Sequence, residues 1–236
     1  MGKKGVGSHG ISALRSRNNR FERNICVGHV WEGIMVIQRS PGHKIIGNYC
    51  AWNGLNGIYS DDGSHFLLIK GNWCIRNGWN RNIIVSNLGD SCDNEGIQLM
   101  THMYYVLLVD NVCFANRKRG LLAAADMNHF FIIGNYFERI NVDRCIAYLL
   151  GNKVKGKAFI HGMDEAVIID NVFEDLTANG RNLWIVHNLV EGRCSLRPAG
   201  FGKEISNIHL LFNDVGEMEV REPERRICIF VSPVES

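Results

Sequence analysis

A short phrase of apolar and polar residues recurs along almost the whole chain. It consists of two apolar residues, a variable residue, Asn, any residue, and then Cys, Phe or Val. The asparagines of this phrase are Asn24, Asn48, Asn72, Asn111, Asn135, Asn152, Asn171, Asn188 and Asn213. The first three are 24 residues apart, the same spacing leads from Asn87 to Asn111 and Asn135, and later spacings are 17, 19, 17 and 25. Such self-similarity is typical of repeat architectures.

A second phrase keeps the same period and opens short runs of β-forming residues. Its copies are Gly33-Ile34, Gly57-Ile58, Asn82-Ile83, Gly96-Ile97 and Gly120-Leu121. In one run, Ile58 and Ser60 alternate with Tyr59 and Asp61, which is the pattern of a strand with one buried face. The sequence therefore predicts an all-β fold, a single-stranded right-handed parallel β-helix of about nine to ten coils, each rising by about 4.8 Å.

The boundaries of the β-helix domain follow from where the repeated phrases begin and end. We expect the β-helix over residues 10–215, after a flexible N-terminal segment (1–9) and before a charged C-terminal segment (216–236). An array of paired helices is excluded, because Asn and Gly occupy the centre of each period, where such an array needs strong helix formers.

The stacked phrases predict two internal rows of side chains. Each asparagine is expected to take the left-handed conformation of a tight corner and to bond its stacked copy. Two residues further on, the inward position is occupied by Cys26, Cys50, Cys74, Cys113, Phe137, Val154, Phe173 and Val190. Because a metal ligand would not be replaced by Phe or Val, we expect reduced cysteines in the core and neither disulfides nor a metal site there.

The charge and hydropathy of the chain limit the classes of binding partner that we expect. The formal net charge of +2 and the absence of a long apolar segment favour neither nucleic acid nor a membrane as a partner. The first ten residues contain no secretory signal, so we expect a cytoplasmic protein, a virion-borne protein or part of a larger exported one. The first and last coils of a stack expose unpaired strand edges, which must be covered by other residues. We therefore expect a homo-oligomer such as a trimer, or a longer chain.

With Gly57-Ile58-Tyr59-Ser60 and the segment from Ile69 to Cys74, the chain resembles the repeats of the pectate-lyase-like parallel β-helix superfamily over about residues 10–215. Members include polysaccharide lyases, glycoside hydrolases, mannuronan epimerases and phage tailspike depolymerases. The resemblance implies a lyase, hydrolase or epimerase acting on an acidic polysaccharide. None of the enzymes' signatures is matched; the segment Asp61-Asp62-Gly63-Ser64-His65 lacks the proline of the epimerase motif. The alternative is a non-catalytic structural or glycan-binding solenoid, such as a tail-fibre or tailspike segment.

Counting from each Gly-Ile start places a set of polar residues along one edge of one sheet. The set contains Tyr59, Asp61, Asp62, Gln98, His102 and Asp126, provided that a short coil near residues 82–95 keeps the register. We expect Asp61, Asp62, His102 and Asp126 to be catalytic, and Tyr59 and Gln98 to bind substrate. The two adjacent carboxylates could also hold Ca²⁺, although no cofactor is required. Aspartate is common at corners for structural reasons alone.

A second set of residues could bind the glycan. Trp73 should point outward from its strand, and Trp79 lies in a glycine-containing corner; exposed indoles are platforms for sugar rings. Lys70 and Arg76 could meet an acidic substrate, although a solvated surface would contain the same residues. The run Arg117-Lys118-Arg119 is interpreted as a solvated basic corner.

Overall fold

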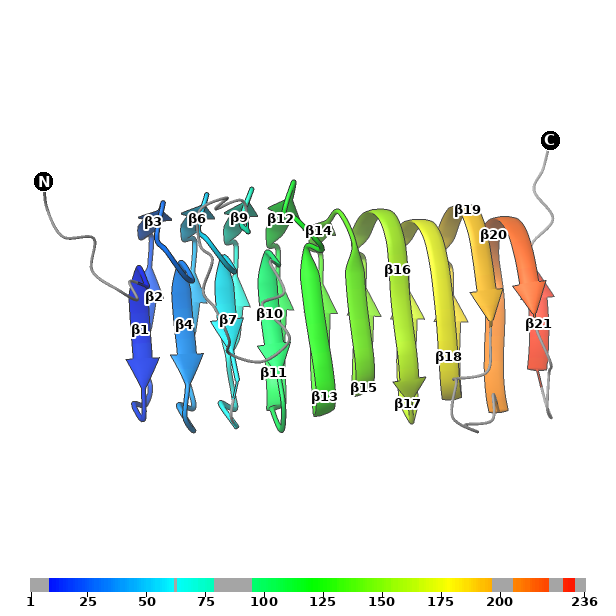
Figure 1. The fold of residues 1–236 in the computed structure, drawn as a ribbon. Coiled ribbons are helices and arrows are strands. Elements are labelled where there is room, and N and C mark those ends of the chain that lie inside the picture. The colour runs from blue at the N-terminus through cyan, green and yellow to red at the C-terminus, as the bar shows by residue number, and fades with distance from the viewer. Residues whose placement is uncertain (1–8, 62, 79–94, 197–205, 221–226, 232–236) are drawn as a thin grey trace, which may run out of the picture.

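The computed structural model describes residues 9–61, 63–78, 95–196, 206–220 and 227–231. These ranges contain β-strands and no helix, so the protein is all-β as predicted. The strands form coils that follow one another along a single axis, from β1 at one end to β21 at the other (Figure 1). None of the described residues forms a helix that could cross a membrane.

Each early coil contains three short strands, which stack on the strands of the next coil. The first strand stack begins with β1 (Ile11–Leu14), β4 (Ile34–Ile37), β7 (Ile58–Ser60) and β10 (Ile97–Met100). The second begins with β2 (Arg20–Glu22), β5 (Lys44–Ile46), β8 (Leu68–Lys70) and β11 (Tyr104–Val109). The third begins with β3 (Ile25–Val27), β6 (Tyr49–Ala51), β9 (Trp73–Ile75), β12 (Val112–Phe114) and β14 (Tyr136–Phe137).

Longer strands continue these stacks in the later coils. They are β13 (Leu121–Ile133), β15 (Ile140–Leu150), β16 (Lys153–Met163), β17 (Glu165–Ile169), β18 (Val172–Val186), β19 (Leu189–Leu196), β20 (Ser206–Val220) and β21 (Ile227–Val231). All strand pairs are parallel; in the third stack, for example, Tyr49 pairs with Trp73 and Trp73 with Val112. We name the turn between the first and second stacks the first corner, and the turn from the third stack to the next coil the third corner.

The pairing corrects the expected coil near residues 82–95. Tyr59 of β7 pairs directly with Gln98 of β10, and Asn72 bonds directly to Asn111. No coil therefore lies between them. The step from Asn72 to Asn111 takes 39 residues where the step from Asn48 to Asn72 takes 24, and Asn82, Ile83 and Asn87 fall in the sequence of this longer step, which we call the insertion. These three residues lie outside the described ranges. The spacing of 24 residues from Asn87 to Asn111 misled the sequence interpretation.

The asparagine ladder is confirmed over its whole length. Asn24 donates from its backbone N and from Nδ2 to Oδ1 of Asn48, at 2.9 and 3.0 Å, and Asn48 bonds Asn72 in the same way. The ladder continues through Asn111, Asn135, Asn152, Asn171 and Asn188 to Asn213. Buried backbone N–H groups at the corner thus obtain partners, which a buried corner requires.

At the corner between the second and third strand stacks, the residue with a left-handed backbone conformation is the one before the asparagine. Positive φ values occur at Arg23, Gly47, Gly71, Asp110, Gly134, Gly151, Asp170 and His187. The expectation that the asparagine itself is left-handed is therefore wrong. Its side chain is turned into the corner, where Nδ2 of Asn72 donates to the carbonyl of Ile45 at 2.8 Å, so the bend falls on the preceding residue.

The inward row is also confirmed. Cys26, Cys50, Cys74 and Cys113 are free, buried and paired in register, and Cys113 pairs with Phe137 of the next coil. Cys194 is likewise free and buried, and Cys145 is buried with its thiol donating to the carbonyl of Asp143. Ile58 and Ser60 point inward with 0% exposure, as the alternation predicted. One apolar core thus runs along the axis of the stack.

Two features extend beyond the sequence interpretation. The strand stack continues past residue 215, because β20 ends at Val220 and pairs with β21, within the segment expected to be a charged tail. A second ladder lies at the third corner, where His29, Asn53 and Asn77 donate from their backbone N to Oδ1 of Asn53, Asn77 and Asn116.

Candidate functional site

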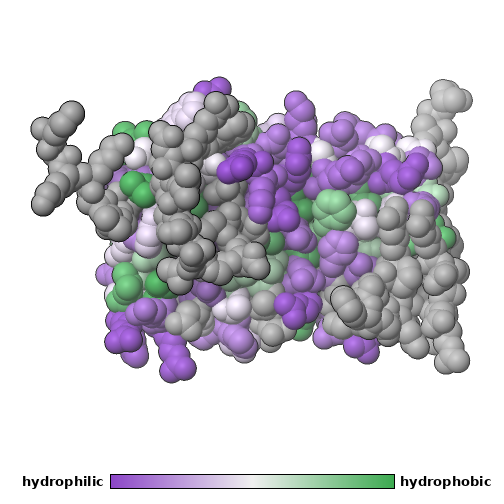
Figure 2. All heavy atoms as spheres, viewed as in Figure 1, coloured by the Kyte–Doolittle hydropathy of each residue, from purple (hydrophilic) through white to green (hydrophobic). Residues whose placement is uncertain are grey.

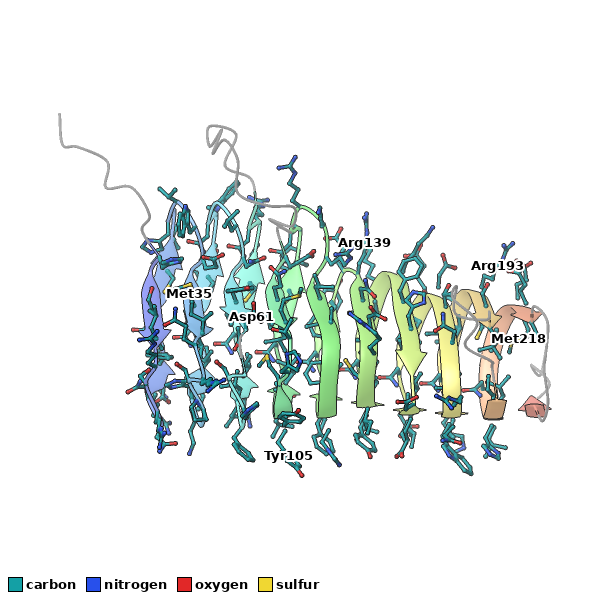
Figure 3. The ribbon with its side chains drawn as sticks, turned by 60° about the horizontal axis from the view of Figure 1, so that its bottom comes forward. Met35, Asp61, Tyr105, Arg139, Arg193 and Met218 are labelled. Atoms are coloured by element: carbon teal, nitrogen blue, oxygen red, sulfur yellow. The ribbon has the colours of Figure 1, made fainter. Side chains whose placement is uncertain are left out.

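The structure brings part of the predicted edge together. Tyr59 and Gln98 are direct neighbours in the first strand stack. The Tyr59 hydroxyl donates to Oδ2 of Asp61 at 2.7 Å, and the Thr101 hydroxyl donates to Oδ1 of the same carboxylate. Asp61 is thus held as an acceptor beside the first corner (Figure 3).

His102 lies at the same corner and is exposed. It lines a cleft of about 400 Å³ together with Arg17, Arg39, Pro41, Gly63, His65 and Tyr104. Thr101, which bonds Asp61, directly precedes His102 in the chain, so the structure brings the expected acid and base to one corner. Their catalytic roles stay predictions.

Three predicted residues lie outside what the structure describes. Asp62 and Trp79 fall in the gaps between the described ranges, and Asp126 lies in β13 without a described side chain. In the described ranges, no group of three or more His, Cys, Asp or Glu side chains could hold a metal ion. Calcium binding through Asp61 and Asp62 therefore stays a prediction as well.

The predicted glycan-binding residues occupy more than one face. Trp73 points outward from the third strand stack with 51% exposure, as predicted, and its neighbour Tyr49 is 39% exposed. Arg76 lies 5.0 Å from the ring of Trp52, which is itself 50% exposed. Lys70 is exposed on the second strand stack instead. Trp73, Arg76 and Lys70 therefore do not form one site.

The third corner carries a cationic groove that the sequence interpretation missed. The groove has a volume of about 810 Å³. Its lining residues are Phe114, Ala115, Arg117, Lys118, Arg119, Tyr136, Glu138, Arg139, Ile140, Lys155, Gly156, Lys157, Phe159, Glu174 and Asp175. Arg139 lies on the upper side of the stack in Figure 3, opposite Tyr105. In Figure 2, hydrophilic residues gather along this upper side of the later coils.

The charges in this groove are unbalanced. It contains six cationic side chains and three carboxylates. Arg119 pairs with Glu95 at 2.7 Å, but Arg117, Arg139, Lys155 and Lys157 form no ion pair within the described part of the chain. Two of the carboxylates accept backbone N–H groups, Glu138 from Ala115 and Asp175 from Arg193, both at 2.9 Å. An anionic ligand would therefore find four uncompensated cations.

The groove lies where the third corner becomes shorter. Residues 115–120 connect β12 to β13, but only residues 138 and 139 connect β14 to β15. The side chain of Arg117 stands on the last long corner, and Arg139, Lys155 and Lys157 stand on the short corners beyond it. The alternation of Lys153, Lys155 and Lys157 was the available signal in the sequence, because it sends all three side chains outward.

Comparison with known proteins adds no family to this picture. No protein-family model, no curated protein and no solved structure matches the chain. The site must therefore be judged by its residues alone.

Proposed function

We propose that the chain is a right-handed parallel β-helix that binds an acidic polysaccharide along its third strand stack and third corner. The observation that supports this most directly is the groove with four uncompensated cations, Arg117, Arg139, Lys155 and Lys157. Arginine and lysine side chains are the usual partners of carboxylate and sulfate groups. The pectate-lyase-like resemblance of the repeats agrees with this ligand class.

An aromatic strip leads into the groove. Tyr49 and Trp73 are paired neighbours on the outer surface of the third strand stack. Trp73 pairs with Val112, and Val112 with Tyr136, which already lines the groove. Phe114, another lining residue, is 39% exposed in the adjacent row. Sugar rings stack on such rings by their apolar faces, so a glycan lying along the axis would contact rings first and cations next.

The spacing of the groove suits a chain ligand. Its cations come from successive coils, which rise by about 4.8 Å each, roughly the length of one sugar residue in an extended polysaccharide. Beyond these coils a second hollow of about 660 Å³ contains Asp175, Glu191 and Glu217. These carboxylates would repel an anionic chain, so the bound stretch should end near Lys157.

Binding is tested with polygalacturonate and alginate as acidic probes, dextran as a neutral one and single-stranded DNA as an unrelated polyanion. In isothermal titration calorimetry the double variant Lys155→Ala/Lys157→Ala should lose at least tenfold in affinity for the acidic glycans. Lys44→Ala is the matched control, because Lys44 is exposed on the second strand stack. Equal binding of dextran, preferred binding of DNA, or an unchanged affinity in the double variant would contradict the proposal.

Cleavage of the polysaccharide is the second candidate function. It is favoured by one observation, the presence of Asp61 and His102 at the first corner beside a cleft that contains Arg17 and Arg39. New reducing ends or unsaturated-uronate absorbance would reveal turnover, and both Asp61→Asn and His102→Ala should abolish it. Glycan binding without turnover in the unmodified protein would reject cleavage and leave the binding function intact.

A further inference from the structure

The first-corner cleft contains cationic and neutral side chains and no carboxylate among the lining residues that the structure describes. Arg17 and Arg39 also line an adjoining hollow of about 470 Å³ with Arg15 and Gln38. We propose that this cleft is a separate binding site for a phosphate or sulfate monoester, with Arg17, Arg39 and His65 as its ligand-contacting residues. The site is independent of the third-corner groove and of the polysaccharide proposed for it.

The hollow exists because a glycine interrupts a row of side chains. Ser16 donates from its backbone N to Oγ of Ser40, and Ser40 in turn to Ser64, which fixes the register of the first corner. The preceding residues therefore form the row Arg15, Arg39, Gly63 and, after the insertion, His102. Gly63 leaves a gap one coil high between Arg39 and His102, and its φ of +71° suits glycine.

The shape of the gap is defined by its neighbours. A Cβ placed on Gly63 would lie 3.7 Å from Cγ of Arg39 and 3.7 Å from two atoms of the His65 ring. These are ordinary contact distances, so a larger side chain at position 63 would occupy the hollow without moving its walls. A bound group in the gap would thus touch Arg39 on one side and His65 on another.

The arginines at this corner have no carboxylate partner in the described part of the chain. Arg15, Arg17 and Arg39 are exposed and form no ion pair with any residue in the described ranges. Other arginines of this chain do have carboxylate partners, such as Arg119 with Glu95 and Arg193 with Glu217. Three uncompensated guanidinium groups on two adjacent coils repel one another, and a doubly charged anion between them removes that repulsion.

His65 gives independent support for a ligand. Its Nδ1 atom is buried and has no hydrogen-bond partner, and its ring contacts the ring of Tyr104 at a centroid distance of 4.8 Å. Burial lowers the pKa of His65, so the ring is neutral near pH 7. The other ring nitrogen, Nε2, borders the gap at 3.7 Å from a Cβ placed on Gly63, and a ligand oxygen or hydroxyl in the gap can form a hydrogen bond with it.

The arrangement suits a tetrahedral anion better than a carboxylate. Arg17 and His65 stand in one row of the corner, and Arg39 stands in the neighbouring row on the other side of the gap. Donors therefore reach the centre from different directions. A phosphate or sulfate group has three terminal oxygens to accept them, whereas the two oxygens of a carboxylate lie in one plane. The volume of about 400 Å³ leaves room for the sugar-sized remainder of an ester.

The test uses calorimetric titration of the full chain with inorganic phosphate, inorganic sulfate, a hexose phosphate, a hexose sulfate and a hexuronate. We expect one of the two esters to bind at least tenfold more tightly than the hexuronate, and the comparison of the two esters identifies the anion. Arg39→Ala should reduce this affinity at least tenfold. Gly63→Asn should do the same by filling the gap, because Asn tolerates a left-handed backbone.

The matched control is Arg144→Ala. Arg144 is an exposed arginine with a φ of +50°, but it lies in a later coil, away from the cleft. Its substitution should leave ester binding unchanged. The proposal is overturned if no ester binds, if the hexuronate binds equally well, or if Arg39→Ala and Gly63→Asn bind the ester as the unmodified chain does. Circular dichroism of each variant confirms that the fold is retained.

Discussion

The coils before and after residue 120 turn their third corner in different ways. In the earlier coils the strands are short, and the corner is a separate segment held by the ladder of Asn53, Asn77 and Asn116. In the later coils strands of up to 15 residues run through the corners with register shifts. The ladder ends at Asn116, and Glu138 of the next coil accepts the N–H of the neighbouring Ala115. Shortening the corner thus replaces a polar ladder by a bend in a continuous strand.

This difference explains why the cationic groove lies where it does. A long corner beside a short one leaves a step on the surface, and the side chains on both sides of the step face a common hollow. Arg117 stands on the long side, and Arg139 stands on the short side. The binding surface is therefore a consequence of coil length, and its cations would not converge in a stack of equal coils.

The largest loss of stability should come from a substitution in the core beside the step between the long and the short corners. Phe137 is fully buried and continues the row of cysteines, and its Cβ and Cδ1 atoms would lie 3.1 and 3.2 Å from a Cβ placed on Gly120. Phe137→Ala should lower the free energy of unfolding by about 3–5 kcal/mol, because it leaves a large cavity. Cys74→Ala in an earlier coil should cost only about 1 kcal/mol, since it removes a single heavy atom. Urea denaturation measures both.

A similar loss for the two variants would contradict this comparison. It would mean that Phe137 does not fill the step and that the two halves of the core are equally packed. An unchanged slope of unfolding free energy against urea concentration is the control that both variants unfold from the same native state.

The next effect concerns the polar ladder of the early corners. Oδ1 of Asn77 accepts from the backbone N and Nδ2 of Asn53, and Nδ2 of Asn77 donates to the carbonyl of Cys50. Asn77→Ala should cost about 2–3 kcal/mol, because several buried groups lose their partners. Glu138→Ala removes the single bond to Ala115 at the end of the ladder and should cost about 1 kcal/mol. Thermal unfolding followed by circular dichroism compares the two, and a larger loss for Glu138→Ala would reject the ladder's role.

The sequence predicted what depends on strict periodicity. The ladder through Asn24, Asn48 and Asn72 and the stacked cysteines follow from equal spacing, because residues one coil apart must touch. It could not show that a single coil spans the 39 residues from Asn72 to Asn111, because Asn87 imitates the phrase at the right spacing. The second ladder was missed for the opposite reason, since Asn53, Asn77 and Asn116 stand in loop segments without an apolar phrase around them.

The candidate site was predictable only in part. Asp61 and His102 were placed at one corner correctly, because both are counted from a Gly-Ile start within regular coils. The cationic groove depends on the change in corner length after Phe114, and stacking positions by a fixed period hides such a change. The Lys153, Lys155 and Lys157 alternation shows which side chains point outward, but it does not show that Arg117 and Arg139 lie beside them.

The smallest effect is the dependence of stability on alkaline pH, to which buried thiols of both the early and the late coils contribute. Burial raises the pKa of the Cys74 thiol well above its ordinary value of 9.0, and burial raises the pKa of Cys194 to about 12. Because the folded chain holds these thiols protonated, their contribution to stability is complete below pH 9 and is lost as the pH rises from 9 towards and beyond 12. Each thiol adds at most about 1.4 kcal/mol of loss per pH unit. Cys74→Ala should therefore lose less stability than the unmodified chain between pH 8 and pH 10.5 in urea denaturation. Identical losses in the two proteins would show that the early stack does not hold the Cys74 thiol protonated.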